Sequence, residues 1–409
     1  GYLMLAAGAG VIVSNLDPLG KMIEHGFHIT GVVPNNEAIV AVAQKVLGVE
    51  TMSILVVGLL MNLCIARFTK FKYVFLTGHH SLFMACLMSA VLGTAGLSGM
   101  ELILVGGFLM GAWSAISPAI GQSYTSKVTD GDEIAIGHFG SLGYYLSAWV
   151  AKYVGKAEDS TEDIEIPEKW GFLRDSTLST ALTMIVFYLI AAFAAGSEFV
   201  ATLSGDMSPY LYAVMSAMNF AVGVTIVYSG VRMILGDLIP AFQGIATKII
   251  PNAIPAVDCA VFFTYAPTAV VLGFLSSFIG GIIGMLILGA VGGVLIIPGL
   301  VPHFFCGATA GIYGNATGGR RGAAVGAFLN GLAITFLPAL ALPVLGQLGF
   351  QNTTFGDADF AVMGLVLGNA YEWVGMAGIY GIVAIAALVL IVPNFIKTKG
   401  KVINYVEED

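Results

Sequence analysis

The residues best suited to bind a polar ligand include two carboxylates that follow prolines. Asp258 lies three residues after Pro255 and directly before the apolar run 259–263, and Glu37 lies three residues after Pro34. A charge in apolar surroundings is costly and needs a reason. We predict that Asp258 accepts hydrogen bonds from a substrate at a broken helix, although it could instead cap the backbone amides freed after Pro255. Glu37 is its counterpart, with a helix N-terminal charge as the alternative.

Three histidines within apolar sequence are further candidates. His79 and His80 are adjacent, and because neighbouring residues of a helix lie about 100° apart, only one should face a cavity. We favour His79 because His303 occupies the corresponding place in the second half of the chain. His138 lies in a glycine-flanked break, Ile136-Gly137-His138-Phe139-Gly140, where a ligand could approach the backbone.

Metal binding and catalysis are less favoured. His79, His138, Glu37 and Asp258 could ligate a metal, but no short spacing such as His-x-x-x-His is present. No Walker A, Gly-x-Ser-x-Gly or dinucleotide fingerprint occurs, so the sequence indicates neither an ATPase nor a hydrolase, and no cofactor is expected. The four cysteines are expected to be small packing residues: Cys64, Cys86, Cys259 and Cys306.

The composition indicates the class of protein that holds these side chains. Of 409 residues, 57% are hydrophobic and 10% charged, and the mean hydropathy is +0.89. Soluble domains contain about 25% charged residues, so a soluble, coiled-coil, disulfide-rich or nucleic-acid-binding protein is excluded. The apolar runs are continuous and not alternating, which predicts an all-α polytopic membrane protein.

Hydropathy divides the chain into apolar segments of spanning length, about 17–25 residues. These are 51–67, 73–95, 99–121, 180–203, 208–235, 260–298 (expected to hold two spans), 322–347 and 374–394. Three interrupted stretches suit half-helices or re-entrant hairpins: 1–16, 28–48 and 134–151. Because the chain opens at Gly1 inside an apolar run, we expect that natural sequence precedes it.

Short matches in one order indicate an internal duplication. Pro34-Asn35-Asn36-Glu37 parallels Pro255-Ala256-Val257-Asp258, and Leu76-Thr77-Gly78-His79 parallels Leu300-Val301-Pro302-His303, at offsets of 221 and 224. Such repeats are often inverted across the membrane in transporters. The predicted division is a first repeat (1–152), an acidic cytoplasmic loop and linking helix (153–205), a second repeat (206–374), and a last span with a cytoplasmic tail (375–409).

At these residues the chain resembles a known family, the ascorbate-type enzyme IIC of the bacterial phosphotransferase system, from Gly1 to about Ile396. The residues that carry the resemblance are Leu76-Thr77-Gly78-His79, Val128-Thr129-Asp130-Gly131, Ile136-Gly137-His138, Gly230-Val231-Arg232-Met233, Asp258-Cys259-Ala260, Ala266-Pro267, Ala269-Val270-Val271 and Leu295-Ile296-Ile297-Pro298-Gly299.

The resemblance implies a homodimer in the bacterial inner membrane. Each protomer would have about eleven spans, divided between a substrate-holding core and a V-shaped scaffold domain, and the core would slide in an elevator-like motion. The substrate would be L-ascorbate or a related sugar, phosphorylated by a cytoplasmic B component that an A component charges. This chain would carry no phosphoryl group. Asp258, His79 and His138 would face the substrate.

The chain departs from the family pattern at four expected site positions: Ala9, Glu37, Phe83 and Phe139. There the resemblance implies loss of a serine, a tyrosine and two glutamines. Phe83 and Phe139 remove hydrogen-bond partners and could stack on an apolar ring face. Glu37 would weaken binding of an anion unless it is protonated or paired.

Two other classes of function remain open. One is a proton- or ion-coupled secondary transporter with Glu37 and Asp258 as the relay. The other is a membrane sensor or scaffold that has kept the fold without transport.

Overall fold

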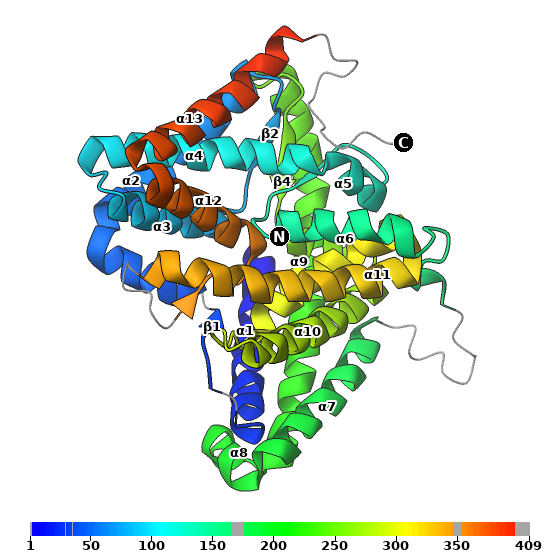
Figure 1. The fold of residues 1–409 in the computed structure, drawn as a ribbon. Helices are drawn as coiled ribbons and strands as arrows, with labels where there is room; N and C mark the ends of the chain where they lie inside the picture. The colour runs from blue at the N-terminus through cyan, green and yellow to red at the C-terminus, as the bar shows by residue number, and fades with distance from the viewer. Residues whose placement is uncertain (1, 29, 35, 165–175, 347–352, 397–409) are drawn as a thin grey trace.

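The computed structural model describes residues 2–28, 30–34, 36–164, 176–346 and 353–396, which are almost entirely helical (Figure 1). The α-helices in this part are α1 (Tyr2–Gly26), α2 (Asn36–Phe68), α3 (Gly78–Thr94), α4 (Gly99–Ile120), α5 (Gln122–Thr129), α6 (Ser141–Val154), α7 (Ser176–Ala195), α8 (Ser197–Ser204), α9 (Pro209–Lys248), α10 (Pro267–Ala290), α11 (Leu300–Gly346), α12 (Ala358–Val374) and α13 (Met376–Ile391). Short 3-10 turns are η1 (Thr161–Asp163), η3 (Cys259–Thr264) and η4 (Val392–Phe395).

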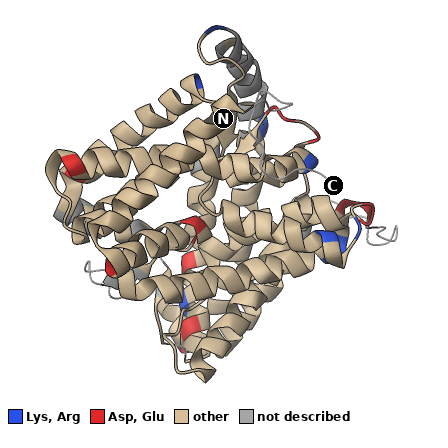
Figure 2. Cartoon of the chain, turned by 45° about the horizontal axis from the view of Figure 1, so that its top comes forward, with Lys and Arg blue, Asp and Glu red and all other residues tan. Residues whose placement is uncertain are grey.

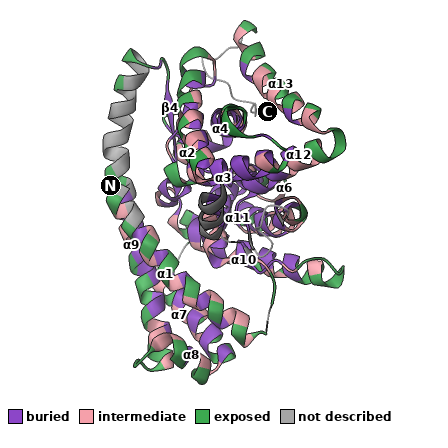
Figure 3. Ribbon diagram, turned by 90° about the vertical axis from the view of Figure 1, so that its left-hand side faces the viewer, coloured by how far each residue is buried: buried purple, intermediate pink, exposed green. Residues whose placement is uncertain are grey.

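Within the described residues, six helices are long and apolar enough to cross a membrane, or seven if the bent pair α7 and α8 counts as one span. These helices need lipid on their outer faces. Only 11% of the apolar window in α13 is buried, and Figure 3 shows exposed residues along α8 and α13. Figure 2 shows few charged residues along most helices. The predicted polytopic helical membrane protein is therefore confirmed at this level.

Two predicted segments differ from the structure. The run 73–95 is not one span, because a short strand precedes the buried helix α3. The run 260–298 does not hold two spans, because it contains η3, the single helix α10 and an irregular segment before α11. Pro267 separates η3 from α10, where it occupies the first turn and needs no hydrogen-bonded amide.

The helix α11 is a hairpin of two helices. Its helical geometry is lost at Gly318 and Gly319, and Gly319 has a φ of +60°, which a side chain would strain. Gly314 and Gly322 face each other across the hairpin so closely that a Cβ on Gly314 would collide with the carbonyl oxygen of Gly322. Small residues thus allow the two backbones to touch.

In the part of the chain that the structure describes, five short strands interrupt the helices and form two parallel sheets. The first sheet has the order β2-β4-β3, from Tyr73–Phe75, Ile254–Val257 and Ala135–Ile136. The second pairs β1 (Val33–Pro34) with β5 (Thr353–Thr354), and Val32 makes a further parallel bridge to Ile296. These strands are a difference from the all-α prediction. Because all pairs are parallel, the carboxyl ends of the strands in each sheet meet at one edge.

We predict that Gly314→Ala lowers the stability of the folded protein. The added methyl must push the helices of the α11 hairpin apart, and overpacking of this kind costs about 1–3 kcal/mol. Thermal unfolding in detergent measures the effect. Gly381→Ala in α13 is the matched control, since its Cβ would have no neighbour within 4 Å. Equal melting temperatures for Gly314→Ala and the unmutated protein would contradict the packing described here.

Candidate functional site

The edge of the first sheet brings together three of the side chains that the sequence singled out. The strand β2 leads into Gly78 and His79, β3 leads to His138, and β4 leads directly to Asp258. Strand pairing therefore gathers residues that lie 59 to 179 positions apart in the chain. We take this cluster as the candidate binding site.

Asp258 and His79 form a pair at the more accessible part of the cluster. The Nε2 atom of His79 lies 3.4 Å from Oδ2 of Asp258, and the two side chains are 55% and 16% exposed. The other carboxylate oxygen accepts a hydrogen bond from the Ala260 amide at 3.0 Å, so Asp258 also caps η3. The two roles considered for Asp258 from the sequence, binding a substrate and capping backbone amides, are therefore compatible.

Asp258 lies in the loop between β4 and η3, and the groups around it there determine its charge. Burial by itself would raise the pKa of Asp258, but the imidazoles of His79 and His138 and the Ala260 amide hold this pKa below its ordinary value. The carboxylate is therefore ionised at neutral pH and accepts hydrogen bonds.

His138 is buried and held by its Nδ1 atom. Nδ1 accepts a hydrogen bond from the Gly140 amide at 3.1 Å and lies 2.8 Å from the hydroxyl of Tyr144. A backbone amide can only donate, so Nδ1 carries no proton and the hydrogen of the neutral ring is on Nε2. Burial lowers the pKa of His138, which favours this neutral form.

The glycines around His138 make room for the protein's own chain. A Cβ on Gly137 would collide with the carbonyl of Ala256, and one on Gly140 would crowd Tyr144. The space beside these glycines is therefore occupied by the protein's own chain, whereas the sequence suggested that a ligand could approach there. The glycines permit the β3–β4 contact and the turn that presents His138.

His80, the neighbour of His79 that the sequence did not favour, also lies against the cluster. His80 is buried with its ring centroid 3.7 Å from that of His138, and its Nδ1 accepts a hydrogen bond from the Phe139 amide at 3.2 Å. Both histidines lie in the first turn of α3, where residues on two sides of the helix can reach the strand ends. His303 is instead buried against α10, with Nδ1 2.9 Å from the hydroxyl of Ser277.

Phe83 and Phe139 form an aromatic layer against the histidines. The Phe83 ring meets the His79 ring edge-on at 5.8 Å, and Phe139 stacks on Phe75 at 4.5 Å. Phe139 is fully buried, so in this conformation it is a packing residue behind His80. Ala9 is half-buried in α1. Glu37 belongs to the first turn of α2, but its side chain lies outside the described part of the structure.

Sequence reasoning missed a buried polar network beside the cluster. Asp357, which precedes α12, accepts hydrogen bonds from the side-chain Nδ2 of Asn36 at 2.7 Å and from the Cys306 thiol at 2.9 Å. Tyr144 lies between Cys306 and His138, within hydrogen-bonding distance of both. Cys306 is thus more than a packing residue, and Cys64 is exposed and not packed inside.

A second buried carboxylate fixes the His138 loop. Asp359 accepts hydrogen bonds from the hydroxyl of Ser141 at 2.8 Å, the amide of Leu142 at 3.0 Å and the indole of Trp113 at 3.2 Å. Its own amide donates to the carbonyl of Phe139 at 2.9 Å. The start of α12 is therefore joined to the start of α6 and to α4.

A separate cavity of about 700 Å³ lies between α1, α7, α10 and the start of α11. Its lining is largely apolar, and Asp17, Lys21 and Glu24 form a charged part of its wall. Asn36, which holds Asp357, also lines it, but none of the clustered histidines or Asp258 does. The chemistry described above therefore does not belong to this cavity.

Comparisons with known proteins agree with a membrane transporter. The family model described as "PTS system sugar-specific permease component" matches residues 1–359. The chain is also similar to a Mycoplasma pneumoniae protein named "Ascorbate-specific PTS system EIIC component", with 27% identity over 377 residues. That match covers 77% of this chain, and the chain spans 56% of the length of the relative.

We predict that Asp359→Ala destabilises the protein by roughly 3 kcal/mol or more. Three donors lose their acceptor, and each unsatisfied buried donor costs about 1–3 kcal/mol. Thermal unfolding in detergent provides the measurement. Trp113→Phe, which removes one of the three hydrogen bonds, should give a clearly smaller decrease. An Asp359→Ala protein with the same melting temperature as the unmutated protein would refute this role of Asp359.

Proposed function

The chain belongs to the family of sugar-specific permease components of the phosphotransferase system, and from this premise we propose that it carries L-ascorbate or a closely related sugar or sugar acid into the cell. The family and the apolar helices make it a multi-pass protein of the bacterial inner membrane. The ascorbate assignment is supported by the name of one relative and by the character of the candidate site.

The observation that carries the proposal is the meeting of Asp258, His79 and His138 at one sheet edge. A sugar offers hydroxyl groups that both donate and accept hydrogen bonds. Asp258 is an acceptor for such a hydroxyl, and the Nε2 hydrogen of His138 is a donor to a ligand oxygen. Imidazole donors also suit the delocalised negative charge of ascorbate. Phe83 would pack against an apolar face of the ligand. We propose the same role for Phe139, in a conformation of the protein that exposes its ring to the ligand.

Strand pairing supports the proposed pair of structural repeats. In one sheet, β4 of the second half lies between β2 and β3 of the first half. In the other, β1 of the first half pairs with β5 and with Ile296 of the second half. Each central strand thus comes from the opposite half, as a duplicated chain would produce. We propose repeats at 1–152 and 206–374, of inverted topology, linked by 153–205, with 375–409 as the last span and tail.

We propose that transport follows the pattern implied by the family resemblance. A core containing the cluster moves against a V-shaped scaffold in a homodimer, with an elevator-like motion. A separate B component, charged through an A component, phosphorylates the sugar on the cytoplasmic side, and this chain is not phosphorylated. Ala9, Glu37, Phe83 and Phe139 would adjust which member of the substrate class is accepted.

Asp258→Asn should weaken sugar binding while leaving the protein folded. Hydrogen bonds to a charged group contribute about 1.5–3 kcal/mol, so we expect roughly a tenfold to hundredfold higher Kd. Calorimetric titration of the purified protein with L-ascorbate, pentitols and sugar acids measures this, and thermal unfolding checks the fold. Asp206→Asn, an exposed acid in the α8–α9 loop, is the control. Unchanged affinity in Asp258→Asn would remove Asp258 from the site.

Glu37→Gln should strengthen binding of an anionic sugar, because it removes a negative charge beside the ligand. The gain requires an ionised carboxyl at position 37, so it should be no smaller at pH 8 than at pH 5. Titrations of both proteins at these two pH values test this. Identical affinities throughout would place Glu37 away from the ligand.

A further inference from the structure

Asp357 is a buried carboxylate that has no charged partner among the residues the structure describes. The residue is 5% exposed, and its two hydrogen-bond donors, Asn36 and Cys306, are both neutral. The two oxygens of a carboxylate offer about four acceptor positions, so part of this capacity is unused. Burying a carboxylate without a charged partner costs free energy, and a further hydrogen-bond donor would offset part of that cost.

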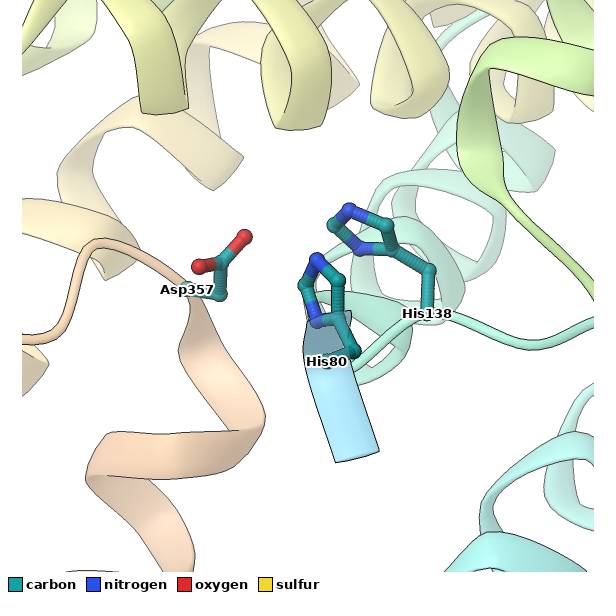
Figure 4. Close-up of side chains that lie close together, drawn as sticks. All are labelled: His80, His138 and Asp357. Atoms are coloured by element: carbon teal, nitrogen blue, oxygen red, sulfur yellow. The ribbon is translucent and has the colours of Figure 1, made fainter. Parts of the chain in front are cut away.

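Two histidines face this carboxylate. Figure 4 shows His80 and His138 projecting toward Asp357 from the start of α3 and from the loop before α6. One ligating atom from each of the three side chains lies within 4.8 Å of the other two. Within that spacing, one small polar group can contact all three side chains at once.

The hydrogen bonds to the Nδ1 atoms of the two rings determine whether their Nε2 atoms donate or accept hydrogen bonds. The Phe139 amide donates to Nδ1 of His80, and the Gly140 amide donates to Nδ1 of His138. Both neutral rings therefore carry their hydrogen on Nε2. The cluster combines imidazole N–H donors with a carboxylate acceptor. A hydroxyl group matches this pattern, because it accepts from an imidazole and donates to a carboxylate.

The same hydrogen bonds disfavour a metal ion. A metal needs a nitrogen lone pair, and the Nδ1 lone pairs are already occupied by backbone amides. Binding through Nε2 would move its proton to Nδ1, where it would face the Phe139 or Gly140 amide hydrogen. Two donors would then point at one another with no acceptor between them.

We propose that Asp357, with His80 as donor and His138 beside it, forms a subsite for one side-chain hydroxyl group of the transported sugar, which is the C5 or the C6 hydroxyl if that sugar is L-ascorbate. This subsite is distinct from the Asp258–His79 pair and comes from the start of α12, so the ligand would be held from both sheets. Asn36 and Cys306 are positioning residues that aim the carboxylate. The inference rests on the proposed function, since it needs a polyhydroxy ligand.

The test is calorimetric titration of the purified full chain with L-ascorbate and with its 5-deoxy and 6-deoxy derivatives. Asp357→Asn should raise the Kd for L-ascorbate about tenfold to hundredfold, as expected for a hydrogen bond to a charged group. For the derivative that lacks the bound hydroxyl, the same substitution should change the Kd less than about threefold, because the interaction is already absent.

Matched variants separate binding from folding. Asp206→Asn, an exposed acid between α8 and α9, is the control and should leave the Kd for each ligand within about threefold. His80→Phe keeps an aromatic ring against Phe360 but removes the N–H donor, and should show the same dependence on one hydroxyl. If Asp357→Asn fails to fold, His80→Phe decides the question through the same deoxy comparison.

Each outcome has one meaning. Wild-type affinity in Asp357→Asn, or equal losses for all three ligands, overturns the subsite while leaving the proposed function intact. Failure of the unmutated protein to bind any sugar of the panel overturns the proposed function itself. Equilibrium dialysis against Zn²⁺ is the last arm: stoichiometric binding that Asp357→Asn abolishes would replace the hydroxyl subsite with a metal site.

Discussion

The structure depends on parallel pairing of short strands inside an otherwise helical membrane protein. Backbone that leaves a helix within a membrane must find hydrogen-bond partners in the protein, because the lipid offers none. The chain meets this requirement by pairing its irregular segments with each other, so that β4 lies between β2 and β3. The pairing satisfies the backbone and, at the same time, gathers the side chains that follow the strands. A stability requirement thus produces a polar site.

Buried hydrogen bonds then fix the orientation of these side chains. Backbone amides hold the imidazoles of His80 and His138 from behind, and Asp359 ties the start of α12 to the start of α6. Asp359 and Leu142 come from opposite halves of the chain, and β4 of the second half lies between two strands of the first, so the site requires both halves to pack together. Asp357 extends the same arrangement toward the second sheet, through Asn36, the first residue of α2, which follows β1.

The sequence predicted the parts of the site that have a local signature. Asp258 follows a proline in apolar sequence and His138 lies between glycines, and both patterns indicate broken helices. His80 was missed because helix periodicity separates it from His79, although strand ends can contact both sides of a first helical turn. Asp357 was missed because its partners are more than 50 residues away in sequence, at Cys306 and Asn36. Hydropathy likewise found the long helices but not the strands, because each strand has only two to four residues and those of the first sheet are as apolar as the helices they interrupt.

The central claim, that the strand ends of the first sheet form the sugar site, is tested most directly by an electron cryomicroscopy structure determined with saturating L-ascorbate. The account predicts ligand density in contact with Asp258, His79 and His138. Density confined to the cavity between α1, α7 and α10, with the histidine cluster unchanged, would contradict it.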